Sequence, residues 1–168
     1  MRIPPSLFQL PATELAPLLI GKLLCRRTKS NIMRLRILET ECYFGEDDSA
    51  CHAHRGKTPR NAPLYLKGGH SYVYLCYGIH NLFNVVSGAE GRPEAVLIRG
   101  VEGFIGPGRL SKALSIDRSL NCIDLSTSSE LWIEDDSFSL PFHTDRRVGI
   151  DYADHVDRDK LWRFIADL

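Results

Sequence analysis

The chain has 168 residues, of which 43% are hydrophobic and 25% charged, and its formal net charge at pH 7 is zero. These values predict one soluble domain, residues 1–168, that buries a hydrophobic core. The first 20 residues hold no apolar run long enough to span a bilayer and no cationic segment of signal type, so we expect a cytoplasmic protein without a membrane partner.

The cysteines and glycines exclude several kinds of site. Five cysteines without a CxxC pair favour neither a disulfide framework nor a zinc cluster, and no Gly-rich phosphate loop is present.

Charge is unevenly spread: residues 1–120 hold 16 Lys/Arg against 10 Asp/Glu, whereas residues 121–168 hold 5 Lys/Arg against 11 Asp/Glu. One face could therefore hold a polyanion while the acidic segment lies elsewhere, although accidental segregation is the plainer interpretation.

In chain order, residues 13–22 predict a short helix that begins at a capping threonine, Thr13. Residues 31–44 alternate as a strand does, and residues 45–70 follow neither period, which predicts a long functional or disordered loop. Residues 71–86 predict two strands around a tight turn at 77–80. The later segments are a strand at 94–102, a turn and helix at 106–116, and short strands at 131–136 and 146–150. Hairpins dominate, which favours the α+β class.

Two glutamates stand out because a strand core normally excludes carboxylates. Glu39 and Glu41 share a strand face with Leu35 and Ile37, and Arg99 lies inside the apolar run 95–99. A Glu–Arg pair would satisfy both kinds of buried charge. Either the pair merely closes a sheet edge, or one carboxylate is held ionised to activate a water molecule; strand phase does not choose between the two glutamates.

Aromatic and polar side chains cluster around the same strands. Tyr72 and Tyr74 share one face, Tyr77 lies at the turn, and they are either core residues or a platform on which bases stack. Asn84 interrupts an apolar strand and needs a hydrogen-bond partner. His52 and His54 lack the further ligands of a metal site, so no metal is expected.

Four segments in order, "RILETECYFGEDDSACHAHRGKTPRN", "LKGGHSYVYLCYGIHNLFNVV", "VLIRGVE" and "GPGRLSKAL", resemble the alkyladenine (3-methyladenine, N-methylpurine) DNA glycosylase family. The match runs without gaps from about residue 36 to 86 and extends to most of the chain. The resemblance implies a compact single domain around a curved antiparallel sheet, with flanking helices and a protruding hairpin. It implies no cofactor and no metal, a monomer, and a partner that is double-stranded DNA containing damaged purines; a bacterial protein would be associated with the nucleoid.

The resemblance also implies a role for each matching residue. Glu41 matches the general base, while Arg99 and the backbone carbonyl of Val148 match groups that hold the catalytic water. The flipped purine would be held by Tyr43, His52, Tyr74 and Asn84. Tyr77 matches the residue that intercalates into DNA, and the expected DNA-contacting residues are Arg60, Asn61 and Lys67. The implied reaction is hydrolysis of the N-glycosidic bond of an alkylated or deaminated purine, which leaves an intact abasic site because no lysine nucleophile matches.

Two alternatives remain open. A closely similar fold serves as a non-catalytic nucleic-acid-binding module, but such a module has no need of the water site formed by Glu41 and Arg99. A small-molecule nucleosidase would have no use for an exposed wedge such as Tyr77 or for a basic loop.

Overall fold

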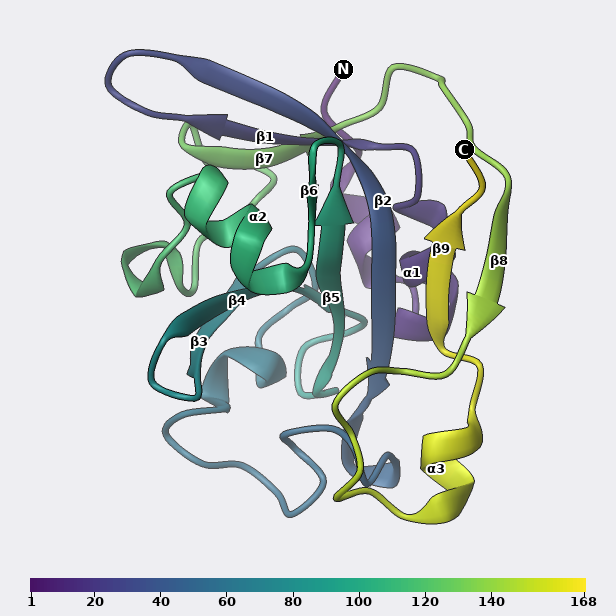
Figure 1. Cartoon of the computed structure of the whole chain (residues 1–168). Coiled ribbons are helices and arrows are strands. Elements are labelled where there is room, and N and C mark those ends of the chain that lie inside the picture. The colour runs from purple at the N-terminus through teal and green to yellow at the C-terminus, as the bar shows by residue number, and fades with distance from the viewer.

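The longest strand, β2 (Ile32–Phe44), runs through the middle of a curved, nine-stranded antiparallel sheet (Figure 1). This computed structural model describes residues 1–168. The other strands are β1 (Leu23–Arg27), β3 (Ser71–Cys76), β4 (His80–Ser87), β5 (Glu94–Val101), β6 (Phe104–Ile105), β7 (Leu131–Glu134), β8 (Phe142–Asp145) and β9 (Arg163–Ala166). Their order is β3-β4-β5-β2-β1-β7, with β6 on β5, β9 on β2 and β8 on β9.

The chain contains three short α-helices: α1 (Ala12–Leu18), α2 (Pro107–Ala113) and α3 (His155–Asp159). The chain also contains four 3₁₀ helices, Pro5–Gln9, Gly45–Asp47, Ala62–Tyr65 and Arg118–Leu120. Helix α1 packs on β2 and β5, and α2 packs on β4 and β5. Their apolar side chains join one core cluster with the sheet, which includes Leu15, Leu110, Phe83 and Ile98. None of the helices combines the length and the apolar content needed to cross a membrane.

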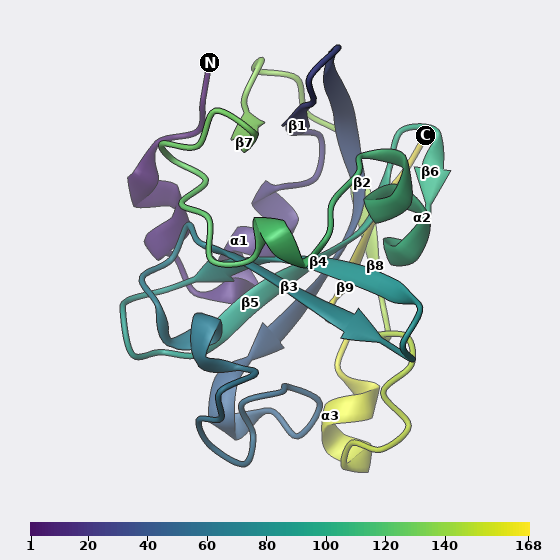
Figure 2. The same ribbon diagram turned by 90° about the vertical axis from the view of Figure 1, so that its left-hand side faces the viewer.

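Several predicted features are confirmed: the α+β class, the curved antiparallel sheet, and the protruding hairpin of β3 and β4, which Figure 2 shows in front of β5. The predicted strand at 94–102 is β5, the helix within 106–116 is α2, and the strand at 131–136 is β7. The long segment 45–70 contains no strand and only two short 3₁₀ helices.

Other predictions were wrong at their boundaries or in kind. Helix α1 begins at Ala12 after Pro11, without a side-chain cap from Thr13, and it ends at Leu18, before a turn in which Gly21 adopts φ +87°. Residues 146–150 form an irregular segment rather than a strand, since Gly149 adopts φ +74°, outside the β region. The strand lies just before it, as β8, and the pairing of β8 with β9 was not predicted.

The middle of β2 pairs irregularly with β5. The register with β5 shifts between Ile37 and Thr40, and Leu38 is the residue without a partner on β5. Ile37 and Leu38 both join the main core, whereas Glu39 and Glu41 face arginines. Since two consecutive residues, Ile37 and Leu38, both contact the core at this irregular point of the strand, the glutamates do not share the environment of Ile37, contrary to the sequence-based expectation.

Candidate active site

A cavity of about 620 Å³ opens between the β3–β4 hairpin, strand β5, the start of α2 and the segment 148–152. This volume is within the range of small-molecule binding sites. The cavity brings together most of the residues predicted from the sequence: Tyr43, His52, Arg60, Tyr74, Tyr77, Asn84, Arg99 and Val148. Glu41 lies directly behind this wall, because its hydrogen-bond partners Tyr43 and Val148 line the cavity.

Glu41 is fully buried, and both of its carboxylate oxygens have donors. Oε1 accepts a hydrogen bond of 2.6 Å from the backbone N–H of Val148 and lies 3.6 Å from Arg99 Nε. Oε2 accepts a hydrogen bond of 2.8 Å from the Tyr43 hydroxyl. Burial raises the pKa of Glu41, and the charge of Arg99 and the Val148 hydrogen bond offset only part of that rise. A raised pKa makes Glu41 a stronger base than an exposed carboxylate. The structure thus places the amide of Val148 on Glu41, and the role of its carbonyl stays a prediction.

Glu39 lies on the same stretch of β2 but has different partners. Its Oε1 accepts hydrogen bonds from Arg99 Nε at 3.0 Å and from Arg163 Nη1 at 3.2 Å. The predicted Glu–Arg pair therefore exists, and Arg99 stands between the two carboxylates.

Aromatic rings form the sides of the cavity. The His52 and Tyr74 rings lie 4.5 Å apart between centroids, and Tyr43 also lines the cavity. Desolvation, with help from the charge of Arg60, lowers the pKa of His52 to about 4, so this ring is neutral at pH 7. Its Nδ1 lies 3.0 Å from the Tyr72 hydroxyl, which fixes the orientation of the ring. The aromatic rings of the side walls are therefore uncharged.

Asn84 is buried on β4 and lines the cavity. Its Nδ2 donates a hydrogen bond of 3.1 Å to the carbonyl of Tyr72 on β3, so the side chain does join two strands. No group of the protein donates to its Oδ1, which leaves an acceptor available to a ligand.

The hairpin tip presents Tyr77 to solvent. This side chain is 87% exposed, and its backbone adopts φ +51°, which is uncommon for a bulky residue. Gly78 follows with φ +67°, and the Ile79 N–H closes the turn on the Cys76 carbonyl at 3.1 Å. An exposed aromatic ring in a strained turn gains nothing from the core, which favours a functional role.

The loop residues predicted to contact DNA differ in exposure. Arg60 and Lys67 are exposed, and Arg60 lies 5.4 Å from the Tyr74 ring centroid. Asn61 is only 2% exposed; its Nδ2 donates to the carbonyls of His52 and Gly56, and its Oδ1 accepts from Thr58 N–H. Asn61 thus orders the loop that carries His52 and has no free polar group directed to solvent.

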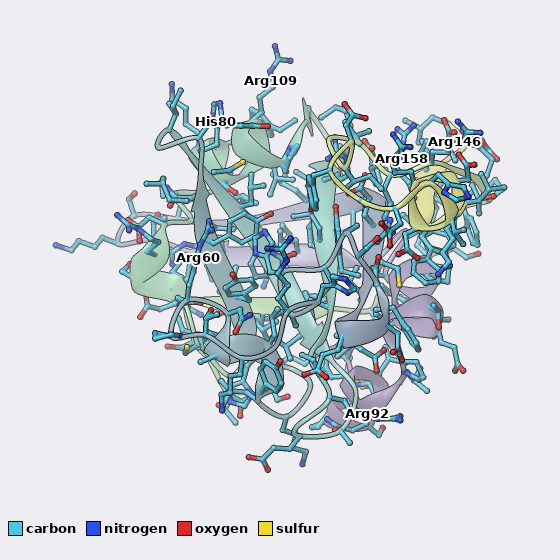
Figure 3. The ribbon with its side chains drawn as sticks, turned by 90° about the horizontal axis from the view of Figure 1, so that it is seen from below. Arg60, His80, Arg92, Arg109, Arg146 and Arg158 are labelled. Carbon is cyan, nitrogen blue, oxygen red and sulfur yellow. The ribbon has the colours of Figure 1, made fainter.

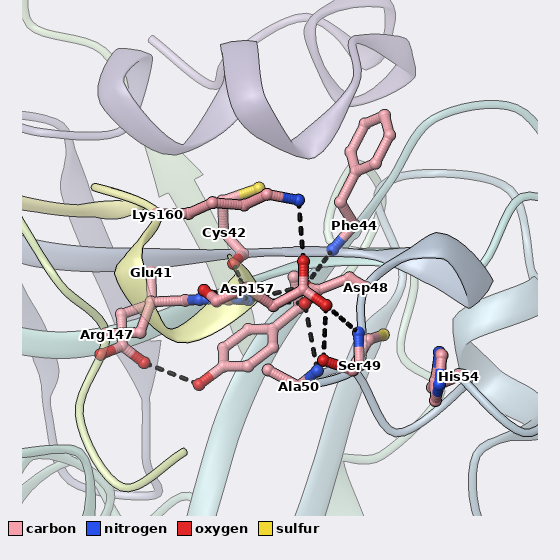
Figure 4. A network of polar contacts seen from close by, with 12 residues as sticks. Glu41, Cys42, Phe44, Asp48, Ser49, Ala50, His54, Arg147, Asp157 and Lys160 are labelled. Atoms are coloured by element: carbon pink, nitrogen blue, oxygen red, sulfur yellow. Dashed lines mark hydrogen bonds and ion pairs between the residues drawn. The ribbon is translucent and has the colours of Figure 1, made fainter. Parts of the chain in front are cut away.

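A buried network behind the cavity was not predicted (Figure 4). Arg147 and Asp48 are fully buried and form two hydrogen bonds, of 2.6 and 2.9 Å. Arg147 also donates to the carbonyls of Cys42 and Asp157, and its guanidinium lies 5.0 Å from the Tyr43 ring centroid. This ion pair ties the segment that carries Val148 to the end of β2. The signal in the sequence was the arginine pair in "RRVGI", but local patterning cannot show which arginine points inward.

The charges are arranged differently from the sequence-based expectation. Acidic residues of the segment 130–136 pair with basic residues of β1, β2 and the residue preceding β1; these pairs are Lys22–Asp135, Arg26–Glu130, Arg34–Glu134 and Arg36–Asp136. Arg60 and Arg109, which line the cavity, form no ion pair within the protein. Figure 3, seen from below, shows Arg60 over the molecule and His80 and Arg109 at its upper edge. Two of the cations available to a polyanion therefore lie next to the cavity. Arg109, like Tyr152, lines the cavity but was not singled out in the sequence.

The comparisons with known proteins agree with one another. The sequence model described as Methylpurine-DNA glycosylase (MPG) matches residues 6–104 and 102–167. A protein of Psychrobacter cryohalolentis, provisionally named 3-methyladenine DNA glycosylase, is 42% identical over 193 aligned residues, covering 97% of this chain and 91% of that protein. Proteins with the same provisional name from Borreliella burgdorferi and Methanocella arvoryzae are 43% and 40% identical, covering 91% and 96% of this chain and 89% and 90% of their own length.

Proposed function

The chain belongs to the methylpurine-DNA glycosylase family, and we propose that it removes alkylated and deaminated purines from DNA by hydrolysing the N-glycosidic bond. One observation carries this proposal: Glu41, a buried carboxylate with a raised pKa, lies beside Arg99 at the wall of an aromatic cavity. The names of the relatives point to 3-methyladenine as one substrate.

The cavity requires a base that has left the DNA helix. A base stacked inside a duplex cannot reach a site of this depth, so the nucleotide must rotate out of the stack. Tyr77, exposed at the hairpin tip, is placed to fill the gap that remains. Arg60 and Arg109 at the cavity offer cations to the phosphates on either side.

The chemical step follows from the charges behind the cavity wall. Departure of a purine leaves an oxocarbenium-like sugar, and the negative charge of Glu41 stabilises it. Glu41 then accepts a proton from the attacking water, which Arg99 and the Val148 carbonyl help to hold. No lysine lines the cavity, so a Schiff-base step has no nucleophile, and the product is an abasic site in an intact strand.

The neutral aromatic walls favour a damaged base that carries positive charge. An alkylated purine is cationic, and it is attracted to the π faces of Tyr43 and Tyr74. His52 remains uncharged at pH 7 because its pKa is about 4, so it does not repel this cation. For the same reason His52 cannot protonate a neutral purine, and hypoxanthine is expected to leave more slowly than 3-methyladenine.

A base-release assay tests the proposed function. Duplexes that carry 3-methyladenine, 7-methylguanine, hypoxanthine or ethenoadenine are incubated with the protein, and the free base and abasic site are measured. Release of base without strand cleavage is expected. Binding to these duplexes without any release would instead favour a non-catalytic nucleic-acid-binding module, and release from free nucleosides alone would favour a nucleosidase.

Tyr77→Ser tests the wedge. We expect weaker binding to abasic duplexes and a larger loss of excision rate on duplex than on single-stranded DNA, because unstacking costs a few kcal/mol that an inserted ring offsets. Parallel single-turnover rates on the two substrates give the comparison. Phe138→Ser, which removes an exposed ring outside the cavity, is the control. An unchanged ratio of duplex to single-strand rates together with a lower melting temperature would make Tyr77 a structural residue.

Asn84→Ser tests base discrimination. The side chain lies in the cavity wall with its amide nitrogen bound to the Tyr72 carbonyl, so its position is fixed. Its bulk would collide with the 2-amino group of guanine, whereas adenine and hypoxanthine carry only hydrogen there. We expect the serine variant to excise 7-methylguanine and undamaged guanine more readily relative to hypoxanthine. Ratios that stay at wild-type values while thermal stability falls would leave Asn84 as a link between β3 and β4 only.

A further inference from the structure

Glu39 is a second buried carboxylate beside the site, and the steps above do not use it. It is 7% exposed on β2 and does not line the cavity. Its Oε1 accepts from both Arg99 Nε at 3.0 Å and Arg163 Nη1 at 3.2 Å. A buried carboxylate is costly without such partners, so Glu39 and the two arginines form one unit.

Arg99 is anchored by only one of its three nitrogens. Its Nε is shared between Glu39 at 3.0 Å and Glu41 at 3.6 Å, and neither Nη donates a hydrogen bond within the protein. Arg99 lines the cavity, so both Nη groups remain available on that side for water or substrate. A planar guanidinium held at Nε by Glu39 has little freedom to turn away.

Arg163 connects the same unit to the segment that carries Val148. Its Nε donates to the Arg146 carbonyl at 2.7 Å, and its Nη2 lies 2.8 Å from Asp145 Oδ2. Asp145 is the last residue of β8, and Arg146 precedes Arg147 and Val148, whose amide binds Glu41. Glu39 thus contacts Arg99, which lies beside Glu41, and Arg163, which binds the segment that carries Val148.

The sheet leaves space for Glu39 at this point. Gly100 on β5 is its partner across the strands. A Cβ at Gly100 would lie 3.0 Å from Ile105 Cδ1 and 3.2 Å from Glu39 Cβ, tighter than ordinary contact. Gly100 has no unusual φ, so close approach rather than backbone conformation explains the glycine.

We propose that Glu39, fixed by Arg163, is a positioning residue: it holds Arg99 by Nε so that both Nη groups face the cavity, and its negative charge offsets part of the Arg99 charge beside Glu41. The rate effect rests on the proposed function, whereas the charge effect can be measured without substrate. Glu39 itself touches no reacting atom and is not a catalytic residue.

The charges around Glu41 determine the direction in which its pKa should change when Glu39 or Arg163 is neutralised. Glu41 lies near Arg99 on β5, Arg147 after β8, and Tyr43, and Arg99 stands between it and Glu39 on the same strand. Removing the Glu39 charge leaves Arg99 fully effective, so the pKa of Glu41 should fall, by about one unit for charges a few ångströms apart in protein. Removing the Arg163 charge should raise it by a smaller amount, because Arg163 acts through Glu39.

The test uses Glu39→Gln and Arg163→Gln, with Glu94→Gln as the matched control. Glu94 is also a buried glutamate near β2, but it accepts from Ala12 N–H outside this network. The pKa of Glu41 is measured without DNA by NMR titration of ¹³C-labelled glutamate carboxyls, with Glu41→Gln used for assignment. Single-turnover excision rates measured across a pH series show how activity falls in acid. Duplex affinity is measured separately.

Opposite shifts of the Glu41 titration in the two variants are expected, downward for Glu39→Gln and upward for Arg163→Gln, with none for Glu94→Gln. Glu39→Gln should also lose about ten- to a hundred-fold in plateau excision rate at unchanged duplex affinity, since misplaced groups cost rate rather than binding. An unmoved Glu41 titration, or a lower melting temperature as the only effect, would make Glu39 a structural ion pair. A wild-type protein that releases no base would refute the proposed function, while the NMR shifts would still report on Glu39.

Discussion

Glu41→Gln is expected to lose base release by about a hundred- to ten-thousand-fold while duplex binding is retained. An amide cannot accept the proton of the attacking water, and it carries no negative charge to stabilise the sugar cation. Its shape fits the site: Gln Oε1 can accept from Val148 N–H, as Glu41 Oε1 does at 2.6 Å. Single-turnover rates on a 3-methyladenine duplex, with affinity measured on an abasic duplex, separate the two effects.

The same variant should fold at least as stably as the wild type at pH 7. Burial raises the pKa of Glu41 above its ordinary value, so the stability that this group contributes is fully present below the unfolded pKa. It is lost as pH rises through the folded pKa, and a neutral glutamine avoids that loss. Thermal melts at pH 7 check this expectation. Near-normal turnover in Glu41→Gln together with an inactive Glu39→Gln variant would assign the role of general base to Glu39.

Wild-type activity should likewise decline in acid at a higher pH than an ordinary carboxyl group would give. Only ionised Glu41 acts as base, and its pKa is raised by burial. The decline in activity should follow the NMR titration of the Glu41 carboxyl group.

Arg147→Met is expected to destabilise the fold by about 3–5 kcal/mol, because it leaves the Asp48 charge buried without a partner. Both side chains are 0% exposed, so water cannot replace the arginine. The change also removes the guanidinium that packs on the Tyr43 ring and binds the Cys42 carbonyl, so excision should fall as well. Urea unfolding at a constant m-value measures the loss.

The adjacent arginine offers a matched control. Arg146 pairs with Asp159 at 3.2 Å, but the two side chains are 65% and 58% exposed. Arg146→Met should therefore change the free energy of unfolding by less than about 1 kcal/mol. The double variant Arg147→Met/Asp48→Asn should recover part of the loss, since no unpaired charge remains. Equal effects at positions 146 and 147 would show that the buried pair has no special energetic weight.

The hairpin and its exposed tip were predictable from the sequence because their causes are local. Alternating residues on either side of Tyr77-Gly78 specify β3, β4 and the turn between them, and the positive φ angles at both turn residues follow from that geometry. The family resemblance also rested on contiguous motifs, and the matches over residues 6–104 and 102–167 bear it out.

The short C-terminal strands were less predictable. β8 and β9 each contain only four residues, and they are strands because they pair with each other and with β2. Such pairing joins residues more than a hundred positions apart, as in Glu41 and Arg163, and no periodicity in a window of ten residues reports it.

The sequence by itself determined which chemical groups are available: two glutamates on one strand, an arginine within an apolar strand, and tyrosines on a hairpin. Alternation left Glu39 and Glu41 equivalent; the family resemblance assigned the general base to Glu41, and the tertiary structure showed the different contacts of the two. The return of the chain through β8 and β9 brings the Val148 amide to Glu41 and Arg163 to Glu39. These contacts depend on where distant backbone segments meet, since a hydrogen bond requires atoms within about 3 Å whatever their separation along the chain.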